Sequence, residues 1–331
     1  MKNSDRTNFA TGGRIGENAA PMTSKEFKIP GRMLGADPSV DRRVVGFLRC
    51  IPFINKHYLL ACYNLLCRKL NKRTLYATTY FGAKMHCTFR DYIQARILHF
   101  GFYEPNISAL IESILKEGDV FLDIGANIGY HSLLASKLVG AEGAVIAIEA
   151  SPSNFAILSL HIRENHAGNV RIINKAASDA PSSVIIYRGL PGNIGTATTI
   201  KSRGYDEEGI VESIPVDHIL TCEELSRLRL IKMDIEGGEL PVLRRFLQTM
   251  DLYPSDIDLI VEVSTWEDPR GWSDVLAQLG DAGFRPYLIE NLYGYDAYLN
   301  WKGPAPLRLL DDVPPGVSDI LFSRREQVNS L

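Results

Sequence analysis

Short apolar runs and amphipathic helical patterns alternate along most of this chain. Residues 120–124 have the length and composition of a buried parallel strand, and from Tyr130 the apolar positions recur at helical spacing. Further strands are predicted at 144–148, 170–173, 184–187, 214–216, 230–234, 259–263, 285–289 and 319–323, and a strand pair at 75–89 with a turn at Gly82. Strands that alternate with helices predict an α/β fold, in which helices cover both faces of a mostly parallel sheet.

A glycine-containing turn joins the strand at 120–124 to the helix that begins at Tyr130. It reads Asp123-Ile124-Gly125-Ala126-Asn127-Ile128-Gly129. A dinucleotide site requires G-x-G-x-x-G, and this turn has no middle glycine. Instead, a carboxylate stands two residues before the first glycine, where it suits a cationic ligand. S-adenosylmethionine has an ammonium and no phosphate, so the turn favours that cofactor, with a nicotinamide-dependent oxidoreductase as the alternative.

The next units supply further candidates for nucleotide contacts. Glu149 ends the second strand, where an acidic residue can accept hydrogen bonds from both ribose hydroxyls. Ser151 and Pro152 then start a helix as its cap and its first residue. The residues after the third strand, which include Ala177, Ser178 and Asp179, fall where an adenine ring would be bordered. The stretch 189–199 has the composition of a loop that folds over a site.

Composition narrows the class of protein. The chain has 331 residues, is 45% hydrophobic and carries a net charge of −3, which gives no reason to expect a nucleic-acid partner. Its five cysteines show neither C-x-x-C nor zinc-site spacing. We therefore expect no disulfide framework and no zinc site, and a reducing compartment, the cytoplasm.

The N-terminal part differs from the rest. Residues 1–75 hold 14 Lys and Arg against 5 Asp and Glu. Residues 1–40 show no periodicity and are predicted to be disordered, and no apolar segment near Met1 indicates a secretory signal. The apolar run at 44–70 is too often interrupted by basic residues to span a bilayer. We expect it to cap the main domain, with weak membrane-surface contact as the alternative. The predicted division is 1–40, a cap at 41–117, and the main domain at 118–331.

Three carboxylates follow or lie within neighbouring strands. Asp234 and Glu236 come at the end of the strand at 230–234, and Glu262 lies inside the next one. Ligands of open α/β sheets bind beyond the strand ends. Such carboxylates can hold a divalent cation, take a proton from a hydroxyl, or bind hydroxyl groups of a substrate. Alternatively, Lys232 or an arginine neutralises them and they are structural.

Taken together, these motifs resemble the FkbM family of S-adenosylmethionine-dependent methyltransferases. The resemblance rests on F-L-D-I-G-A-N-I-G-Y-H-S-L-L-A-S at 121–136, I-E-A-S-P at 148–152 and K-M-D-I-E-G-G-E at 232–239, and extends over about 92–289. It implies a class I methyltransferase sheet of seven strands, the last antiparallel. It also implies O-methylation of a hydroxyl on a sugar, polysaccharide or secondary metabolite, with a small-molecule or glycan acceptor. Residues 1–75 lie outside the resemblance, and the helical N-terminal extension is expected from their own pattern alone.

The resemblance also implies roles for individual residues. The methionine part of the cofactor falls to Asp123, Gly125, Ala126, Asn127 and Gly129, the ribose to Glu149, and the adenine to Ala177, Ser178 and Asp179. Glu104, before the helix that leads into the first sheet strand, is a further cofactor-binding candidate. The acceptor hydroxyl needs a base, for which we expect Asp234 first, Glu236 second and His131 third. A binding protein without turnover is the third alternative.

Overall fold

The computed structural model describes residues 56–70, 74–266, 268–291 and 293–325. The predicted disorder of residues 1–40 and the first part of the apolar run at 44–70, residues 44–55, fall outside these ranges. Among the helices described, none combines the length and the apolar character that crossing a bilayer requires.

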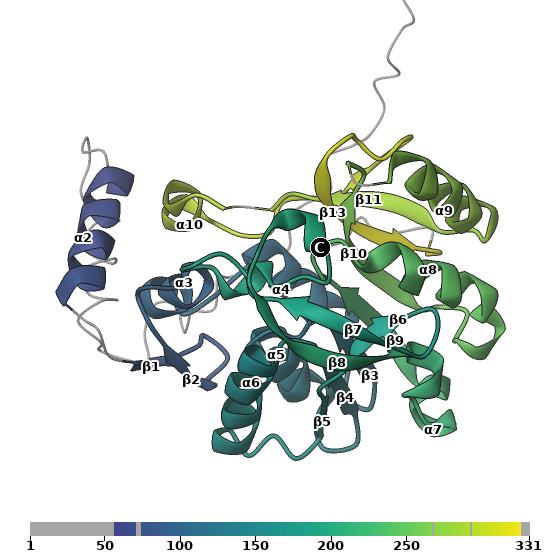
Figure 1. The fold of residues 1–331 in the computed structure, drawn as a ribbon, viewed down its shortest axis with the longest axis horizontal. Helices are drawn as coiled ribbons and strands as arrows, with labels where there is room; N and C mark the ends of the chain where they lie inside the picture. Colours follow the sequence, from purple (N-terminus) through teal and green to yellow (C-terminus); the bar gives the residue numbers. More distant parts are fainter. Residues whose placement is uncertain (1–55, 71–73, 267, 292, 326–331) are drawn as a thin grey trace, which may run out of the picture.

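The centre of the molecule is a sheet of eight strands in the order β12-β11-β13-β10-β9-β3-β4-β5 (Figure 1). The strands are β3 (Val120–Ile124), β4 (Ala144–Ile148), β5 (Val170–Ile173), β9 (Leu228–Met233), β10 (Asp258–Ser264), β11 (Arg285–Ile289), β12 (Arg308–Leu309) and β13 (Val317–Ser323). Strands β5, β4, β3, β9 and β10 are parallel, and β13 is antiparallel to both of its neighbours. The predicted class I sheet is confirmed, with β12 as an additional edge strand. Two residues are too few to show a period, which is why the sequence did not predict β12.

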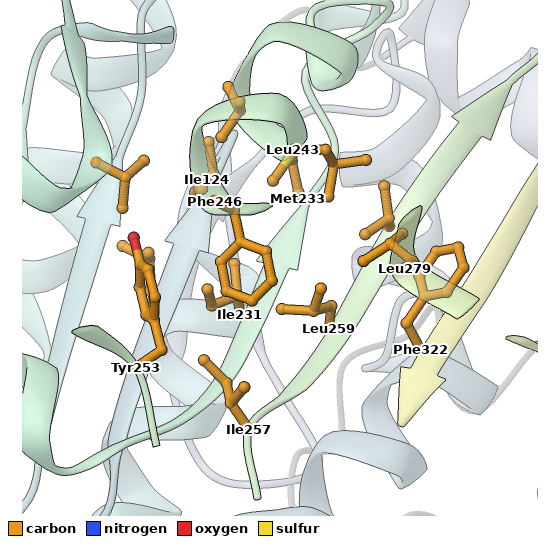
Figure 2. Packing of buried hydrophobic residues seen from close by; sticks show 14 of the residues in the cluster. Ile124, Ile231, Met233, Leu243, Phe246, Tyr253, Ile257, Leu259, Leu279 and Phe322 are labelled. Carbon is orange, nitrogen blue, oxygen red and sulfur yellow. The ribbon is translucent and has the colours of Figure 1, made fainter. Parts of the chain in front are cut away.

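Helices cover both faces of this sheet (Figure 1). One face is covered by α4 (Pro105–Ile114), α5 (Tyr130–Val139) and α6 (Pro152–Glu164), and the other by α8 (Glu239–Gln248) and α9 (Pro269–Asp281). Figure 2 shows the packing on the second face, where Phe246 of α8 meets Ile231 of β9 and Leu259 of β10. Because both faces are buried, the strands are continuously apolar until they reach the polar site at their ends.

The period of two along the strands determines which face the site occupies. Phe121, Leu230, Ile260 and Leu321 come from four adjacent strands and share one core cluster with α4 and α5. Side chains two positions away point to the same face. Continuing each strand by two residues on that face gives Asp123, Lys232, Glu262 and, on the antiparallel strand, Asp319. A row of polar groups therefore crosses the sheet where the row of apolar groups ends.

A second, three-stranded sheet contains β6 (Ala176–Ser178), β8 (Glu207–Pro215) and β7 (Ser182–Tyr187), in that order. The prediction for β8 was wrong in length, because only 214–216 were expected. Its first half is largely exposed and rich in acidic residues, so burial gave it no apolar pattern. The short helix α10 (Tyr295–Asn300) was also not predicted, since six residues are too few to show helical periodicity.

The described part of the N-terminal extension packs on the main domain. Helix α2 (Lys56–Leu70) lies beside α10, and its Leu60 is fully buried in a core cluster with Phe89 and Tyr298. Strands β1 (Leu75–Thr78) and β2 (Lys84–Cys87) form the predicted hairpin, and α3 (Tyr92–Phe100) follows with Asp91 as its N-cap. Leu65 and Leu66 of α2, by contrast, remain exposed.

Candidate active site

A large cavity opens at the C-terminal ends of β3, β4, β9 and β10. Residues of the glycine turn, the carboxylates after β9, and the loop 193–199 line it together. This is the edge at which ligands of open α/β sheets bind. Apart from Ser178 and Asp179, and Gly129 at the far end of the turn, every residue that we predicted for the site lines this cavity.

The glycine turn brings two strand ends together. Gly125 has φ +82°, and a Cβ at this position would lie 1.9 Å from the carbonyl oxygen of Asp234. The backbone N–H groups of Gly125 and Ala126 both donate to the carbonyl of Ile148. Gly129 also has a positive φ, and a Cβ there would meet Leu158 of α6 at 2.5 Å. Gly125 is therefore required by close approach to the backbone as well as by conformation, and Gly129 by its conformation.

Asp123 and Glu104 present unpaired carboxylate oxygens to the cavity. Asp123 Oδ2 accepts a hydrogen bond of 2.5 Å from Ser132 Oγ. Its Oδ1 is buried and has no hydrogen-bond partner among the described residues, and the same holds for Glu104 Oε2. Glu104 has φ 42°, a strained conformation for a non-glycine residue. Two buried acceptors without donors suit an ammonium group, so these residues fit the amino-acid part of S-adenosylmethionine.

Glu149 is held rigidly at the end of β4. Its Oε2 accepts a 2.7 Å hydrogen bond from the Asn127 N–H, and its Oε1 accepts a 2.8 Å bond from the Ser151 N–H. Burial raises the pKa of this carboxyl to about 7, although both N–H donors favour the charged form. Each oxygen keeps a lone pair for a further donor, as two ribose hydroxyls would require.

The residues predicted to border the adenine are only partly at the cavity. Ala177 of β6 lines it. Ser178 and Asp179 do not, and the Ser178 hydroxyl instead donates to Asp179 Oδ1 at 3.2 Å on an exposed edge. The structure gives no support for Ser178 and Asp179 as cofactor contacts. Both residues stand at the end of a strand, as the prediction required. That strand, β6, belongs to the second sheet, however, so its end does not point in the same direction as the strand ends of the central sheet.

Asp234, Glu236 and Glu262 form a cluster in which one oxygen of each lies within 4.8 Å of the others. Asp234 Oδ2 is 3.0 Å from Lys232 Nζ, and Glu236 Oε2 is 2.9 Å from Arg203 Nη1. The side chain of Glu262 makes no hydrogen bond or ion pair with any residue that the structure describes. Burial, followed by the like charges of Asp234 and Glu236, raises the pKa of Glu262 to about 10. Two members of the cluster are thus neutralised and the third is not.

Lys232 is the functional residue that the sequence indicated least clearly, since we considered it only as a structural counter-ion. It is 4% exposed, and burial disfavours its charge. The carboxylates of Asp234, Glu104 and Asp123 more than offset burial and hold its pKa above the usual value. The available signal was the spacing K-x-D, because residues i and i+2 of a strand share a face.

His131, the third catalytic candidate, lies outside the carboxylate cluster. Its Nε2 is 3.8 Å from Glu104 Oε2. Burial, reinforced by the nearby Lys232 cation, holds the pKa of His131 well below its usual value. The imidazole is therefore neutral and belongs to the part of the cavity that fits the methionine moiety.

The loop expected to fold over the site does so. The Ile194 N–H donates to Asp91 Oδ2 at 2.8 Å, and Asn154 Nδ2 donates to the Ile194 carbonyl at 3.0 Å. At its other end, the Thr198 hydroxyl donates to the carbonyl of Glu236 at 2.8 Å. The loop is thus bonded to the N-cap of α3, to α6 and to the turn after β9, and it forms one wall of the cavity.

We expect Asp123→Ala to weaken binding of the cofactor product S-adenosylhomocysteine by roughly 10- to 150-fold, because the variant loses a hydrogen bond to a charged group worth about 1.5–3 kcal/mol. Isothermal titration calorimetry measures this loss. Asp274→Ala, on the exposed side of α9, is the matched control and should bind as the wild type does. An unchanged dissociation constant for Asp123→Ala would remove Asp123 from the cofactor site.

Comparisons with known proteins agree with this site. Residues 123–286 match the methyltransferase FkbM domain. Hexuronic acid methyltransferase AglP of Haloferax volcanii is 27% identical over 185 residues, which cover 53% of this chain and 68% of the relative. Methyltransferase sdnD of Sordaria araneosa is 26% identical over 199 residues, covering 51% and 75%. The crystal structure of methyltransferase FkbM from Methylobacillus flagellatus is 14% identical, covers 86% of this chain and 59% of its own, and superposes with a TM-score of 0.39.

The domain match includes the glycine turn, Glu149 and the carboxylate cluster, and it favours the methyltransferase over the nicotinamide-dependent oxidoreductase. This chain belongs to the FkbM family of S-adenosylmethionine-dependent methyltransferases.

Proposed function

We propose that this enzyme transfers the methyl group to a hydroxyl oxygen of a sugar, a polysaccharide or a hydroxylated secondary metabolite. The observation that supports this most strongly is the cluster of Asp234, Glu236 and Glu262 in the same cavity as the cofactor-binding groups. Carboxylates accept hydrogen bonds from hydroxyl groups, and a set of them can orient an acceptor that carries several hydroxyls. The relative from Haloferax volcanii is named for a sugar-acid substrate, which agrees with an acceptor of glycan type.

The residues of the cavity have separate tasks in this proposal. S-adenosylmethionine, when bound, supplies a methyl group that is already electrophilic because it is attached to a sulfonium. Asp123 and Glu104 hold the amino-acid part, and Glu149 holds the ribose. Asp234 and Glu236, each fixed by its ion pair, orient the acceptor hydroxyl toward the methyl carbon. The loop 193–199 excludes water, which would otherwise compete for the same hydrogen bonds.

The charges around Asp234, Glu236 and Glu262 also predict which acceptors the enzyme prefers. The acidic groups around this cluster, which include Asp319 and Glu239, outnumber the two cations that Asp234 and Glu236 already engage. The acceptor end therefore disfavours an anionic acceptor, because like charges in a partly buried site repel. We therefore place neutral glycosides ahead of glycosides that carry a free carboxylate. This proposal departs from the substrate in the name of the Haloferax relative and is tested separately from oxygen methylation itself.

The test is an acceptor panel assayed with labelled S-adenosylmethionine. Neutral methyl hexosides, the matching hexuronates, hydroxylated cyclohexanes and primary amines are compared, and products are identified by mass spectrometry and by the NMR shift of the new methyl group. We expect a methyl ether on a neutral acceptor. Methylation confined to amines or to carboxylates would contradict the proposal. Methylation of hexuronate hydroxyls at an equal rate would contradict only the preference by charge.

A further inference from the structure

We propose that Glu262 takes the proton of the acceptor hydroxyl, and that this carboxyl loses its own proton only when the cationic cofactor binds. The inference rests on the proposed function, because a hydroxyl acceptor must lose a proton during methylation. It assigns the role of base to a residue that was not among the three candidates from the sequence, Asp234, Glu236 and His131. The argument depends on which groups of the cavity are already paired.

Pairing distinguishes Glu262 from the other candidates. Asp234 is bonded to Lys232, and Glu236 is paired with Arg203. A carboxylate that is already neutralised by a cation is a weaker base. His131 is fully buried beside Glu104, outside the carboxylate cluster. Glu262 lines the cavity, lies within 4.8 Å of the other two carboxylates and has no partner among the described residues.

The charges around Glu262 explain why it is protonated in the free enzyme. Asp234 and Glu236 face it from the end of β9, Asp319 from β13 and Glu239 from α8, all of them acidic. Asp319 is directly opposite in the β10–β13 pairing. The nearby cations, Lys232 and Arg203, are already engaged by Asp234 and Glu236. Burial and this surplus of negative charge raise the pKa of Glu262 to about 10.

A cation bound in the same cavity would offset the surplus of negative charge that keeps Glu262 protonated. An opposite charge within ~4–6 Å favours the charged form of a carboxyl and lowers its pKa. The sulfonium of S-adenosylmethionine is such a charge, whereas the sulfur of S-adenosylhomocysteine is neutral. Binding of the substrate cofactor should therefore release a proton that binding of the product does not. The base would be produced by the cofactor that the reaction requires, and it would return to its protonated form after transfer.

The step is balanced. The acceptor oxygen forms a bond to the methyl carbon, the carbon–sulfur bond breaks, and its electron pair stays on sulfur. The hydroxyl proton passes to the Glu262 carboxylate. The neutral carboxylic acid is then the form that the acidic cluster favours once the sulfonium charge has gone.

Proton release can be measured without any acceptor. The wild-type enzyme is titrated at pH 8 with S-adenosylmethionine and with S-adenosylhomocysteine, by calorimetry in buffers of different ionisation enthalpy. By proton linkage, S-adenosylmethionine should release close to ~1 proton more than S-adenosylhomocysteine. Glu104 and Glu149 also have raised pKa values, of about 8 and about 7. They meet the ammonium and the ribose, which both ligands carry, so their contribution cancels in the difference.

The decisive variant is Glu262→Gln, which keeps the size of the side chain. It should bind S-adenosylhomocysteine as the wild type does, which also shows that it is folded. The difference in proton release between the two ligands should disappear, and single-turnover methylation should fall by ~10²–10⁴. Glu223→Gln, on the exposed helix α7 (Cys222–Ser226), is the control and should keep the wild-type difference.

Two outcomes would overturn the inference. One is equal proton release by both ligands in the wild type, and the other is a difference that persists in Glu262→Gln. Because neither measurement contains an acceptor, both are independent of whether oxygen is the atom methylated. A failure of the proposed function in the acceptor panel is therefore distinguishable from a failure of Glu262 as the base.

Discussion

Asp234→Asn should retain cofactor binding and lose roughly 100-fold in turnover. The substitution preserves the shape of the side chain but removes the charge that Lys232 holds in place at 3.0 Å. The Asp234 N–H donates to the Ile124 carbonyl, so the backbone position is set by the sheet and should not change. What changes is the orientation of the acceptor hydroxyl, and a misplacement of about 1 Å at a reacting centre costs about this much in rate.

Steady-state kinetics and calorimetry test this expectation together. We expect kcat to fall while the dissociation constant of S-adenosylhomocysteine stays within about 3-fold of the wild-type value, since Asp123 and Glu104 are intact. The pH dependence should keep its wild-type shape if Glu262 is the base. Near-normal turnover would show that Asp234 has no part in the reaction.

Lys232→Met should destabilise the folded protein by about 3–5 kcal/mol, the cost of leaving buried charges without their partner. Methionine has a similar length and is apolar, so packing changes little. The variant leaves Asp123 and Glu104 buried with no cation to offset them, and the pKa of Glu104, already raised to about 8 by burial, should rise further.

The loss should depend on pH in a definite direction. A carboxyl whose pKa is raised by folding contributes stability that is present below its unfolded pKa and is lost as the pH rises through its folded pKa. Urea unfolding should therefore show a larger destabilisation of Lys232→Met at pH 8.5 than at pH 5.5. Lys175→Met, which loses only an exposed ion pair with Glu212, is the control and should change stability little. Equal destabilisation at both pH values would mean that Lys232 acts by packing.

The sequence predicted well those parts that depend on local constraints. Buried strands are mostly apolar, so β3, β4 and β9 could be located to within a residue or two. A turn that needs a positive φ and close approach leaves glycine as its signature, which is why Gly125 identified the cofactor corner. Glu149 was predictable for a similar reason, because strand ends in this fold point to the ligand.

Pairing of charges was predictable only in part. The sequence offered Lys232 or an arginine as the partner of these carboxylates, but it could not say which arginine or which acid, because that depends on which segments meet in space. Arg203, which neutralises Glu236, lies 33 residues away on a short turn that carries no periodic pattern. Asp319, which faces Glu262, comes from a strand 57 positions later that inserts into the sheet antiparallel. Because the sequence does not place Arg203 and Asp319 near the cluster, Asp234 was the first candidate for the base. The structure instead gives it a partner and leaves Glu262 without one.

The loop 193–199 has a consequence for how the enzyme acts on an acceptor with many hydroxyls. One end of the loop is bonded to Asn154 on the cofactor side, and the other to Glu236 on the acceptor side. If exchange of spent cofactor opens the loop, the wall proposed to hold the acceptor opens at the same time. We therefore expect each acceptor to leave after a single methyl group. On an oligosaccharide, methylation would be distributive, and singly methylated chains would accumulate before any doubly methylated ones appear.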